Sequence, residues 1–316
     1  MNYRIGVDVG GTGIKAGVLD GDNRIIAKIS VPTGAFRSYK EVAKDMAGAA
    51  GEAARKAGIP LASFPCMGFG MPGSLNPRTG RLAFSGNLGW RDVPIREELE
   101  KYIPVPVYIG NDANCAVIGE VVAGAAGTMK NVVMLTLGTG VGGGVIIDGK
   151  LLRGSDGMGA ELGHMLLVLG GEPCTCGASG CVEAYASAPA LIRQTKEAMA
   201  KHPESMMNPH AVRKGKVSAR TAFDCAKQGD IAALEVVDRY AEYLSAAIGS
   251  LITVFRPEAV LIGGGLSNEK EYLLDRLNRR AAVYAFGSDV VPVPPIIKAT
   301  LGNDAGIIGA AYLDTM

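Results

Sequence analysis

Apolar and polar positions along the chain predict short strands that alternate with longer helices. Short apolar runs that end at glycine, asparagine or aspartate predict strands, and helices are predicted where alanine dominates or apolar residues recur every three or four positions. The predicted strands are residues 3–9, 16–19, 67–71, 105–109, 132–137, 144–147 and 259–262. The predicted helices are residues 39–57, 114–123, 230–255, 268–280 and 305–313. This alternation indicates an α/β fold, and the polar segment 202–216, which contains two prolines, is predicted to be a loop.

One pattern of strand, glycine turn, strand and second turn occurs twice. A shift of 128 positions places residues 9–21 on residues 137–149, so that Gly10 falls on Gly138. The match is a weak internal repeat rather than a close one. Two copies predict duplicated domains that face one another across a cleft.

Composition and charge exclude several classes of protein. The chain has 316 residues, of which 48% are hydrophobic and 20% charged, and this length predicts about two domains. The net charge of +1 gives no sign of a nucleic acid or an acidic membrane as partner. No run approaches the ~18 apolar residues of a membrane span. Because the first residues lack the apolar core of a signal peptide, we expect the cytoplasm.

The densest chemical signal is His164 followed by Cys174, Cys176 and Cys181. Three thiols within eight residues and an imidazole ten positions upstream supply the four ligands of a closed tetrahedral zinc site. In a chain with no export signal, a metal is favoured over disulfides. The alternative is three buried, reduced cysteines and an ordinary polar histidine. A structural zinc ion here would fix a loop.

Two glycine-rich turns, residues 10–13 and 138–143, are candidates for phosphate binding. The second has the glycine spacing of a dinucleotide site, but a strand follows it rather than a helix, so that interpretation is rejected. Consecutive backbone N–H groups in such turns can bind an anion, and Thr12 and Thr139 add hydroxyl donors. The alternative is a pair of hairpins that need glycine only for a positive φ.

A third glycine run, Gly263 to Gly265, follows a buried predicted strand. Glycine there would let a flat group such as a base or a ribose approach the backbone. Close packing of a helix on the strand is an equally good explanation.

Two aspartates lie at the ends of predicted strands. Asp112 suits a general base for a hydroxyl that attacks phosphorus. Its alternative role is a helix N-cap, which the neighbouring Asn111 would fill equally well. Asp8 lies beside the first glycine turn and could hold magnesium through water; the alternative is a hydrogen bond to the turn's own N–H groups.

Assembled, these motifs resemble the ROK family of sugar kinases, whose name stands for repressors, open reading frames and kinases. The resemblance covers essentially the whole chain, and its most specific segments are residues 8–12, 137–164 and 174–183. It implies a two-domain α/β fold of the actin-like ATPase (ribonuclease H-like) type, with a cleft between the domains. The implied small domain is residues 1–117 with 303–316, and the implied large domain, which carries the zinc site, is residues 118–302.

The resemblance also implies roles for individual residues. Asp112 matches the family's catalytic aspartate, and Glu161 to His164 match its Glu-x-Gly-His segment, in which the glutamate contacts sugar hydroxyls and the histidine bridges zinc and sugar. Gly13 departs from the polar or basic residue of many relatives, so no side-chain role is assigned to it. The other implied sugar contacts are Gly73, Asn87, Asn111 and Glu183. The implied nucleotide contacts are Gly10, Gly11, Thr12, Gly138, Thr139, Gly263, Gly264 and Gly265.

The function implied by the resemblance is ATP-dependent phosphorylation of a hexose, first of all glucose, at its 6-hydroxyl. Fructose, mannose, allose and N-acetylmannosamine stay open, because one hydroxyl contact can decide specificity. A non-catalytic sugar sensor is the alternative from another class. The family's repressors carry a DNA-binding module before the kinase-like body, and since the strand with Asp8 begins within the first few residues, we expect no such module. The implied cofactors are structural zinc and magnesium with ATP, and the implied assembly is a homodimer or homotetramer.

Overall fold

The structure is a computed structural model that describes residues 3–316, and the chain divides into two compact units. Unit 1 comprises residues 1–132, 144–160 and 300–316, and unit 2 comprises residues 133–143 and 161–299. These positions differ from the predicted boundaries after residues 117 and 302.

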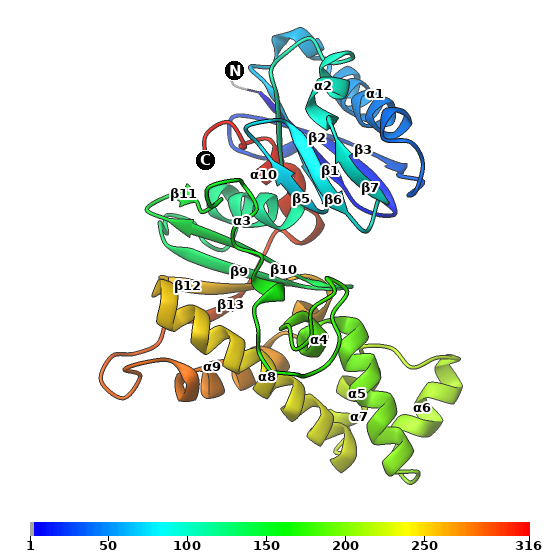
Figure 1. Ribbon diagram of the computed structural model, residues 1–316, viewed down its shortest axis with the longest axis vertical. Helices are drawn as coiled ribbons and strands as arrows, with labels where there is room; N and C mark the ends of the chain where they lie inside the picture. Colours follow the sequence, from blue (N-terminus) through cyan, green and yellow to red (C-terminus); the bar gives the residue numbers. More distant parts are fainter. Residues whose placement is uncertain (1–2) are drawn as a thin grey trace. The chain divides into compact units, whose positions relative to one another are not determined.

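Close packing of two helices explains why the segment after residue 117 stays in unit 1. Helix α3 (Asp112–Ala123) lies against α10 (Ala305–Ala310), as Figure 1 shows. A Cβ atom on Gly119 would lie only 2.3 Å from the carbonyl oxygen of Ala305. Glycine therefore lets the two backbones approach each other, and α3 belongs to the same unit as the C-terminal helix.

Unit 1 is built on a five-stranded sheet of order β3-β2-β1-β4-β8. The pairs β1–β2 and β2–β3 are antiparallel, and β1–β4 and β4–β8 are parallel. A second, three-stranded antiparallel sheet has the order β5-β6-β7. The strands are β1 (Arg4–Val9), β2 (Gly13–Leu19), β3 (Ile25–Pro32), β4 (Met67–Met71), β5 (Ser74–Asn76), β6 (Arg81–Ser85), β7 (Trp90–Val93) and β8 (Val107–Asn111).

The two faces of the larger sheet bury different helices. Because side chains alternate along a strand, the apolar residues of β1 share one face, where they join a core with α1 (Tyr39–Ala57). Gly6 and Asp8 belong to the other face. A Cβ atom on Gly6 would lie 2.0 Å from the carbonyl oxygen of Ile307 in α10. The C-terminal helix therefore packs directly on the strand that carries Asp8. Unit 1 also contains η1 (Leu61–Ser63), α2 (Ile95–Glu100) and η4 (Gly302–Asp304).

A second five-stranded sheet has the order β11-β10-β9-β12-β13. The strands β9 and β10 have the bounds of β1 and β2 shifted by 128 residues, so the structure confirms the predicted repeat. Each glycine turn therefore joins the first two strands of its copy. The division between the units falls inside β10, after Gly143. The strands are β9 (Val132–Leu137), β10 (Val141–Ile147), β11 (Lys150–Leu151), β12 (Ala259–Gly263) and β13 (Ile296–Lys298).

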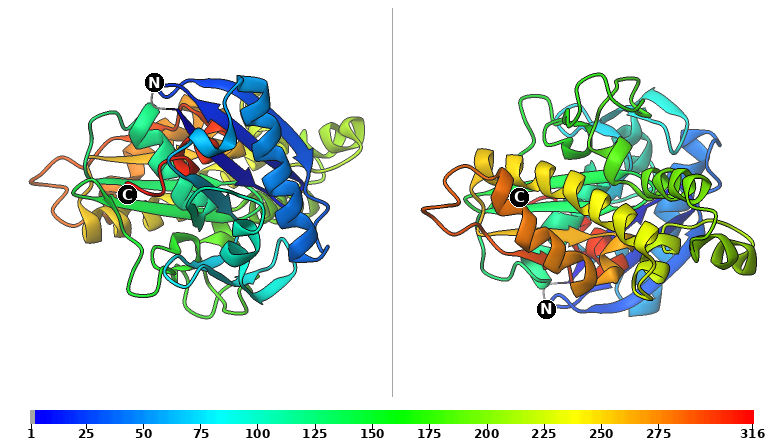
Figure 2. Two further views of the ribbon diagram at one scale, coloured as in Figure 1. Left: turned by 90° about the horizontal axis from the view of Figure 1, so that it is seen from above. Right: turned by 90° about the horizontal axis from the view of Figure 1, so that it is seen from below.

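Helices make up most of unit 2. The long helix α8 (Ile231–Phe255) agrees with the prediction and begins after Asp230, whose carboxylate accepts a hydrogen bond of 2.7 Å from the Ala233 N–H. It lies beside α9 (Glu271–Tyr284), as Figure 1 and Figure 2 show. Within residues 3–316, neither α8 nor any other helix has the length and apolar character needed to cross a membrane. The other helices are η2 (Leu162–His164), α4 (Glu183–Ala186), α5 (Ala188–Lys201), α6 (Met207–Lys214), α7 (Thr221–Ala226) and η3 (Gly265–Glu269).

The prediction of a loop over residues 202–216 is wrong, because α6 occupies its centre. Met207, His210 and Ala211 are buried along one side of this helix. Pro209 falls in the first turn, where the missing N–H costs no intrahelical hydrogen bond. The polar composition of the segment therefore hid a short amphipathic helix.

Several predicted elements have different bounds. The predicted helix 268–280 is η3 followed by α9, and helix 305–313 ends at Ala310. The second strand of each repeat begins three residues earlier than predicted, at Gly13 and at Val141. Glycines inside these strands weakened the apolar pattern on which the prediction depended.

Candidate functional site

The predicted site residues are distributed over both units. Unit 1 carries Asp8, Gly10, Gly11, Thr12, Gly73, Asn87, Asn111 and Asp112. Unit 2 carries Gly138, Thr139, Glu161, His164, Cys174, Cys176, Cys181, Glu183, Gly263, Gly264 and Gly265.

Asp112 is the first residue of α3 and directly follows β8. Asn111 caps this helix, because its side-chain oxygen accepts hydrogen bonds from the N–H groups of Ala113 at 2.8 Å and Asn114 at 3.1 Å. The capping role that was the alternative for Asp112 is therefore filled by its neighbour. The half-buried Asp112 carboxylate accepts a bond of 2.9 Å from the Ala113 N–H. The ionised form of this carboxylate is the form that can accept a proton from a hydroxyl.

Two predicted sugar contacts, Asn111 and Gly73, are joined by a hydrogen bond, and Asn111 directly precedes Asp112 in the chain. The Asn111 side-chain amide donates a hydrogen bond of 3.1 Å to the Gly73 carbonyl oxygen. Gly73 has a φ of +120°, and a Cβ atom there would lie 2.2 Å from the Phe84 carbonyl oxygen. Only glycine fits this position, which explains its occurrence after β4. The structure therefore brings together Gly73 and Asn111, next to Asp112.

The first glycine turn is closed by a hydrogen bond of 2.8 Å from the Gly10 N–H to the Gly13 carbonyl oxygen. None of its glycines has a positive φ, so the explanation that they serve only that purpose is wrong. A Cβ atom on Gly11 would have only Asn87 as a neighbour, at 3.7 Å from its Cβ. The exposed Asn87 therefore lies beside the turn, within ordinary van der Waals distance of the position that a side chain on Gly11 would take.

Asp8 lies at the end of β1 and forms an ion pair of 3.6 Å with Lys15, its cross-strand partner in β2. The alternative prediction was that Asp8 would bond to the N–H groups of the glycine turn. Within residues 3–316, the partner of its carboxylate is Lys15 instead. Burial raises the pKa of the Asp8 carboxyl, while Lys15 and Lys28 act in the opposite direction. A carboxylate of this kind can hold magnesium through coordinated water.

In unit 2, His164 and the three cysteines converge, and their ligand atoms all lie within 4.8 Å of one another. The Cys176 and Cys181 sulfurs are 3.7 Å apart, and the His164 Nδ1 is 3.5 Å from the Cys174 sulfur. In a tetrahedral site with Zn–S bonds of about 2.3 Å, neighbouring ligand atoms are about 3.8 Å apart. The four side chains therefore fit zinc, with Nδ1 as the histidine ligand.

The three thiols differ in environment. Burial, followed by the neighbouring thiols, raises the pKa of Cys181 to about 12, and burial also raises the pKa of Cys174. The backbone N–H of Ala178 lowers the pKa of the exposed Cys176. Metal ligation requires deprotonated thiols, so a bound cation would replace protons that the buried sulfurs otherwise retain.

The segment from Glu161 to His164 packs on the second glycine turn. A Cβ atom on Gly163 would lie 1.8 Å from the Val141 carbonyl oxygen, so this position requires glycine. Partial desolvation, with a smaller contribution from Glu183, raises the pKa of Glu161, and His164 opposes it. Glu161 precedes η2 and His164 is its last residue, and the His164 N–H donates a hydrogen bond of 3.0 Å to the Glu161 carbonyl oxygen.

Glu183 connects the second glycine turn to the cysteine cluster. Its Oε2 accepts a hydrogen bond of 3.0 Å from the Val141 N–H, and its Oε1 accepts one of 2.7 Å from the Thr175 hydroxyl. A Cβ atom on Gly140 would lie 2.4 Å from Oε2. Both carboxylate oxygens are therefore engaged within unit 2, although sequence analysis assigned this residue to the sugar.

The remaining candidate nucleotide contacts fall into two groups. A Cβ atom on Gly138 or Gly265 would have no neighbour within 4 Å, so the space beside both backbones is open. By contrast, a Cβ atom on Gly263 would lie 2.6 Å from Met134, and one on Gly264 would lie 2.4 Å from the Leu137 carbonyl oxygen. Close packing against β9 therefore explains these two glycines, and ligand approach remains for Gly138, the exposed Thr139 and Gly265.

A search of protein families finds that the ROK family model matches residues 4–315. The chain belongs to the ROK family. This confirms the resemblance inferred from the glycine turns and the cysteine cluster.

Named ROK proteins resemble the chain over almost its full length. It is 37% identical to a glucokinase of Halalkalibacterium halodurans, over 98% of this chain and 94% of the relative, and 39% identical to a glucokinase of Thermotoga maritima, over 98% and 96%. Among solved structures, a ROK glucokinase of Streptomyces griseus in complex with glucose and AMPPNP has a TM-score of 0.83 and 34% identity, with 98% of each chain covered. The predicted two-domain, actin-like ATPase fold is confirmed by this agreement.

Sequence analysis of this ROK protein missed three contacts that shape the site. Lys15 faces Asp8, the Thr33 hydroxyl donates a hydrogen bond of 2.6 Å to the Gly10 carbonyl oxygen, and Thr175 bonds to Glu183. The hairpin register of residues 4–19 would have predicted the first, because it places Lys15 opposite Asp8. The other two join segments that no local pattern relates.

Proposed function

We propose that this protein transfers the γ-phosphoryl group of ATP to the 6-hydroxyl of glucose. The observation that carries the proposal is the placement of Asp112 at the start of α3, with its capping role taken by Asn111. Glucokinases of the same family are 37% and 39% identical over 98% of the chain, which supports the proposal.

Asp112 is proposed to act as the general base. As the sugar oxygen attacks the γ-phosphorus, its O–H proton passes to the carboxylate, the new O–P bond forms, and the bond to the ADP oxygen breaks. Such a base contributes less than positioning and charge stabilisation in phosphoryl transfer. Asn111 orients the carboxylate by fixing the first turn of the helix.

The two glycine turns are proposed to bind the phosphates through backbone N–H groups. Gly138 leaves open space beside the backbone, which a phosphate needs in order to approach, and a Cβ atom on Gly11 would meet only Asn87, at 3.7 Å. Thr12 and Thr139 supply exposed hydroxyls. Asp8 would hold magnesium through water, and magnesium with ATP neutralises charge on the phosphates.

The cysteine cluster is proposed to hold a structural zinc ion. With Nδ1 of His164 turned to the cysteine sulfurs, its Nε2 is left to meet a sugar hydroxyl. Glu161, Gly73, Asn87 and Asn111 are the other proposed sugar contacts. For Glu183 the observed bonds support a positioning role, since it joins the Gly138–Gly140 turn to the cluster.

The test is ADP release with Mg-ATP and a panel of hexoses that includes glucose, fructose, mannose, allose and N-acetylmannosamine. We expect the highest kcat/KM with glucose. Turnover with another hexose alone would mean that this hexose, and not glucose, is the substrate. Calorimetric sugar binding without any turnover would favour the sugar-sensor alternative.

We further propose that the protein is cytoplasmic and forms a homodimer or homotetramer. Light scattering of the purified chain would check the assembly.

A further inference from the structure

Unit 1 contains a pocket of about 550 Å³ that none of the residues assigned above lines. This volume lies within the ~300–1,000 Å³ typical of small-molecule sites. The pocket runs along the first residues of β8, the edge strand of the larger sheet. Asp112 does not line it and follows the other end of that strand, three residues beyond the lining residue Ile109, or about 10 Å away at the usual rise per residue. The pocket is therefore distinct from the proposed catalytic residue.

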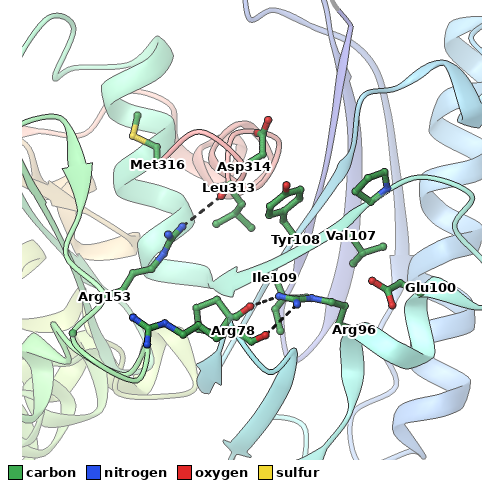
Figure 3. Close-up of a pocket in the computed structure, with 13 residues that line it drawn as sticks. Arg78, Arg96, Glu100, Val107, Tyr108, Ile109, Arg153, Leu313, Asp314 and Met316 are labelled. Carbon is green, nitrogen blue, oxygen red and sulfur yellow. Dashed lines mark hydrogen bonds between the residues drawn. The ribbon is translucent and has the colours of Figure 1, made fainter.

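Three arginines from three separate segments line this pocket, as Figure 3 shows. Arg78 comes from the turn between β5 and β6, Arg96 from α2, and Arg153 from the segment after β11. Within residues 3–316, no carboxylate lies within ion-pair distance of any of the three guanidinium groups. By contrast, most of the other arginines among residues 3–316 form ion pairs, for example Arg4 with Asp314 at 2.6 Å.

Arg96 and Arg153 differ in how far their guanidinium groups are already hydrogen-bonded. Arg96 donates hydrogen bonds to the carbonyl oxygens of Pro77 and Arg78 and thereby holds the turn that carries Arg78. Arg153 is half-buried, and its guanidinium group donates a long hydrogen bond of 3.4 Å to the Leu313 carbonyl oxygen. Since a guanidinium group has five N–H donors, most of the donors of Arg153 are available.

Burial without a counter-charge is unfavourable for Arg153. Desolvation lowers its pKa, with only the Cys115 thiol acting in the opposite direction. Burying a charge is costly unless it is paired. An anion beside this guanidinium would remove that cost.

The pocket also has acidic and hydroxyl groups, and they are separated from the exposed Arg78 and from Arg153. Figure 3 places Glu100 and Tyr108 on the side of the pocket opposite to these two arginines. The second acidic side chain of the pocket, Asp314, forms an ion pair of 2.6 Å with Arg4. The pocket therefore combines a cationic end with an end that can bond to hydroxyl groups.

We propose that this pocket binds a phosphate ester of a small hydroxylated molecule, that is, a sugar phosphate. A phosphate carries nearly two charges and three oxygens, so it can accept from both Arg78 and Arg153, whereas a carboxylate has one charge and two oxygens. Glu100 and Tyr108 would bond to sugar hydroxyls. The proposal relies on the proposed function only for the choice of a hexose 6-phosphate as the first probe.

The test is titration calorimetry with glucose 6-phosphate, inorganic phosphate and glucose, in the presence of saturating glucose and AMPPNP to fill the proposed active site. The variants are Arg153→Met, Arg78→Met and the double variant. The control is Arg279→Met, which removes an exposed arginine of α9 outside the pocket. Arg78 is exposed, so its variant folds even if the Arg153 variant does not.

We expect one molecule of glucose 6-phosphate per chain, bound at least tenfold more weakly by Arg78→Met and Arg153→Met and unchanged in Arg279→Met. Inorganic phosphate should bind more weakly than the ester with the same dependence on the arginines. No binding once the active site is filled, equal binding by the arginine variants, or binding of inorganic phosphate without the ester would each overturn the proposal. Hexose turnover is measured separately, so a chain that binds the ester without kinase activity refutes only the proposed function.

Discussion

The strands of the two copies of the strand–turn–strand repeat have the same lengths and spacing, but different residues surround them. Residues 4–19 place Asp8 before the glycine turn and Lys15 opposite it. In residues 132–147, the position equivalent to Asp8 is Thr136, and a carboxylate comes instead from Glu183, outside the repeat.

This difference separates two tasks that one backbone pattern supports. The first copy lies in the unit that carries Asp112, and its own carboxylate suits a magnesium site. The second copy is held in place by Glu183, which ties its turn to the cysteine cluster. Under the proposed function, the repeat would supply two phosphate-binding turns, of which the first has its own carboxylate, Asp8, and the second is linked by Glu183 to the candidate zinc site.

The largest effect is expected from Asp112→Asn, which removes the proton acceptor near the first copy. Asparagine keeps the shape but cannot take a proton, so turnover should fall by about 10³-fold with glucose affinity unchanged. Steady-state kinetics and glucose calorimetry check this. Asp22→Asn, at an exposed turn of the same unit, is the control and should behave as wild type. A nearly active Asp112 variant would remove Asp112 from the mechanism.

The second copy should depend on the metal. Cys181→Ser removes a buried ligand, and we expect the zinc content to fall from about one ion per chain to none and Tm to fall by about 5 °C or more. Elemental analysis and differential scanning calorimetry measure both. The control is Cys66→Ser, at a buried cysteine outside the cluster. Equal zinc content in the Cys181 variant would show that the cluster is not a zinc site.

Loss of the link that Glu183 makes between the cysteine cluster and the second turn should destabilise the protein less than loss of a zinc ligand. Glu183→Ala leaves the Val141 N–H without its acceptor, which should lower the free energy of unfolding by about 1–3 kcal/mol. Urea denaturation measures this, and Glu204→Ala, at an exposed glutamate, should leave the value unchanged. The link would be unimportant if both variants had the stability of wild type.

Filling the open space at the second turn should affect binding rather than folding. A side chain on Gly138 meets no protein atom within 4 Å, so Gly138→Val should fold normally and raise the KM for ATP about tenfold, equivalent to about 1.4 kcal/mol. Gly140→Val, which would strike Glu183, should instead lower Tm. An unchanged KM for ATP in the Gly138 variant would mean that no phosphate approaches this turn.

The smallest effect concerns the acid that only the first copy has. Because burial raises the folded-state pKa of Asp8, its ionised form disfavours the fold at neutral pH, and the penalty disappears as the pH falls through that pKa. Asp8→Asn should therefore be as stable as wild type or slightly more stable at pH 7, with the difference vanishing below the ordinary aspartate pKa of about 3.9. Thermal unfolding against pH measures it, and a variant that is less stable at pH 7 would show that the Lys15 pair outweighs burial.

The sequence predicted the parts of the molecule that depend on local pattern. The shift of 128 residues relates β1 to β9 and β2 to β10, and the apolar spacing of residues 230–255 predicted helix α8. The convergence of the four candidate zinc ligands was predictable because they lie within eighteen residues of chain, from His164 to Cys181.

What the sequence could not predict depends on contacts between distant segments. The engagement of Glu183 with Val141, 42 residues away, has no local signature. The pocket depends on Arg78 and Arg153, which are 75 positions apart. Helix α6 was missed for a different reason, since its apolar face is short and its other residues are polar.

The most direct test of the central claim is phosphorus NMR of the products formed from Mg-ATP and glucose. The account predicts ADP and a phosphomonoester coupled to the two protons on C6 of glucose, formed by wild type and about 10³-fold more slowly by Asp112→Asn. Inorganic phosphate as the only new phosphorus product, or an ester at another hydroxyl, would contradict it.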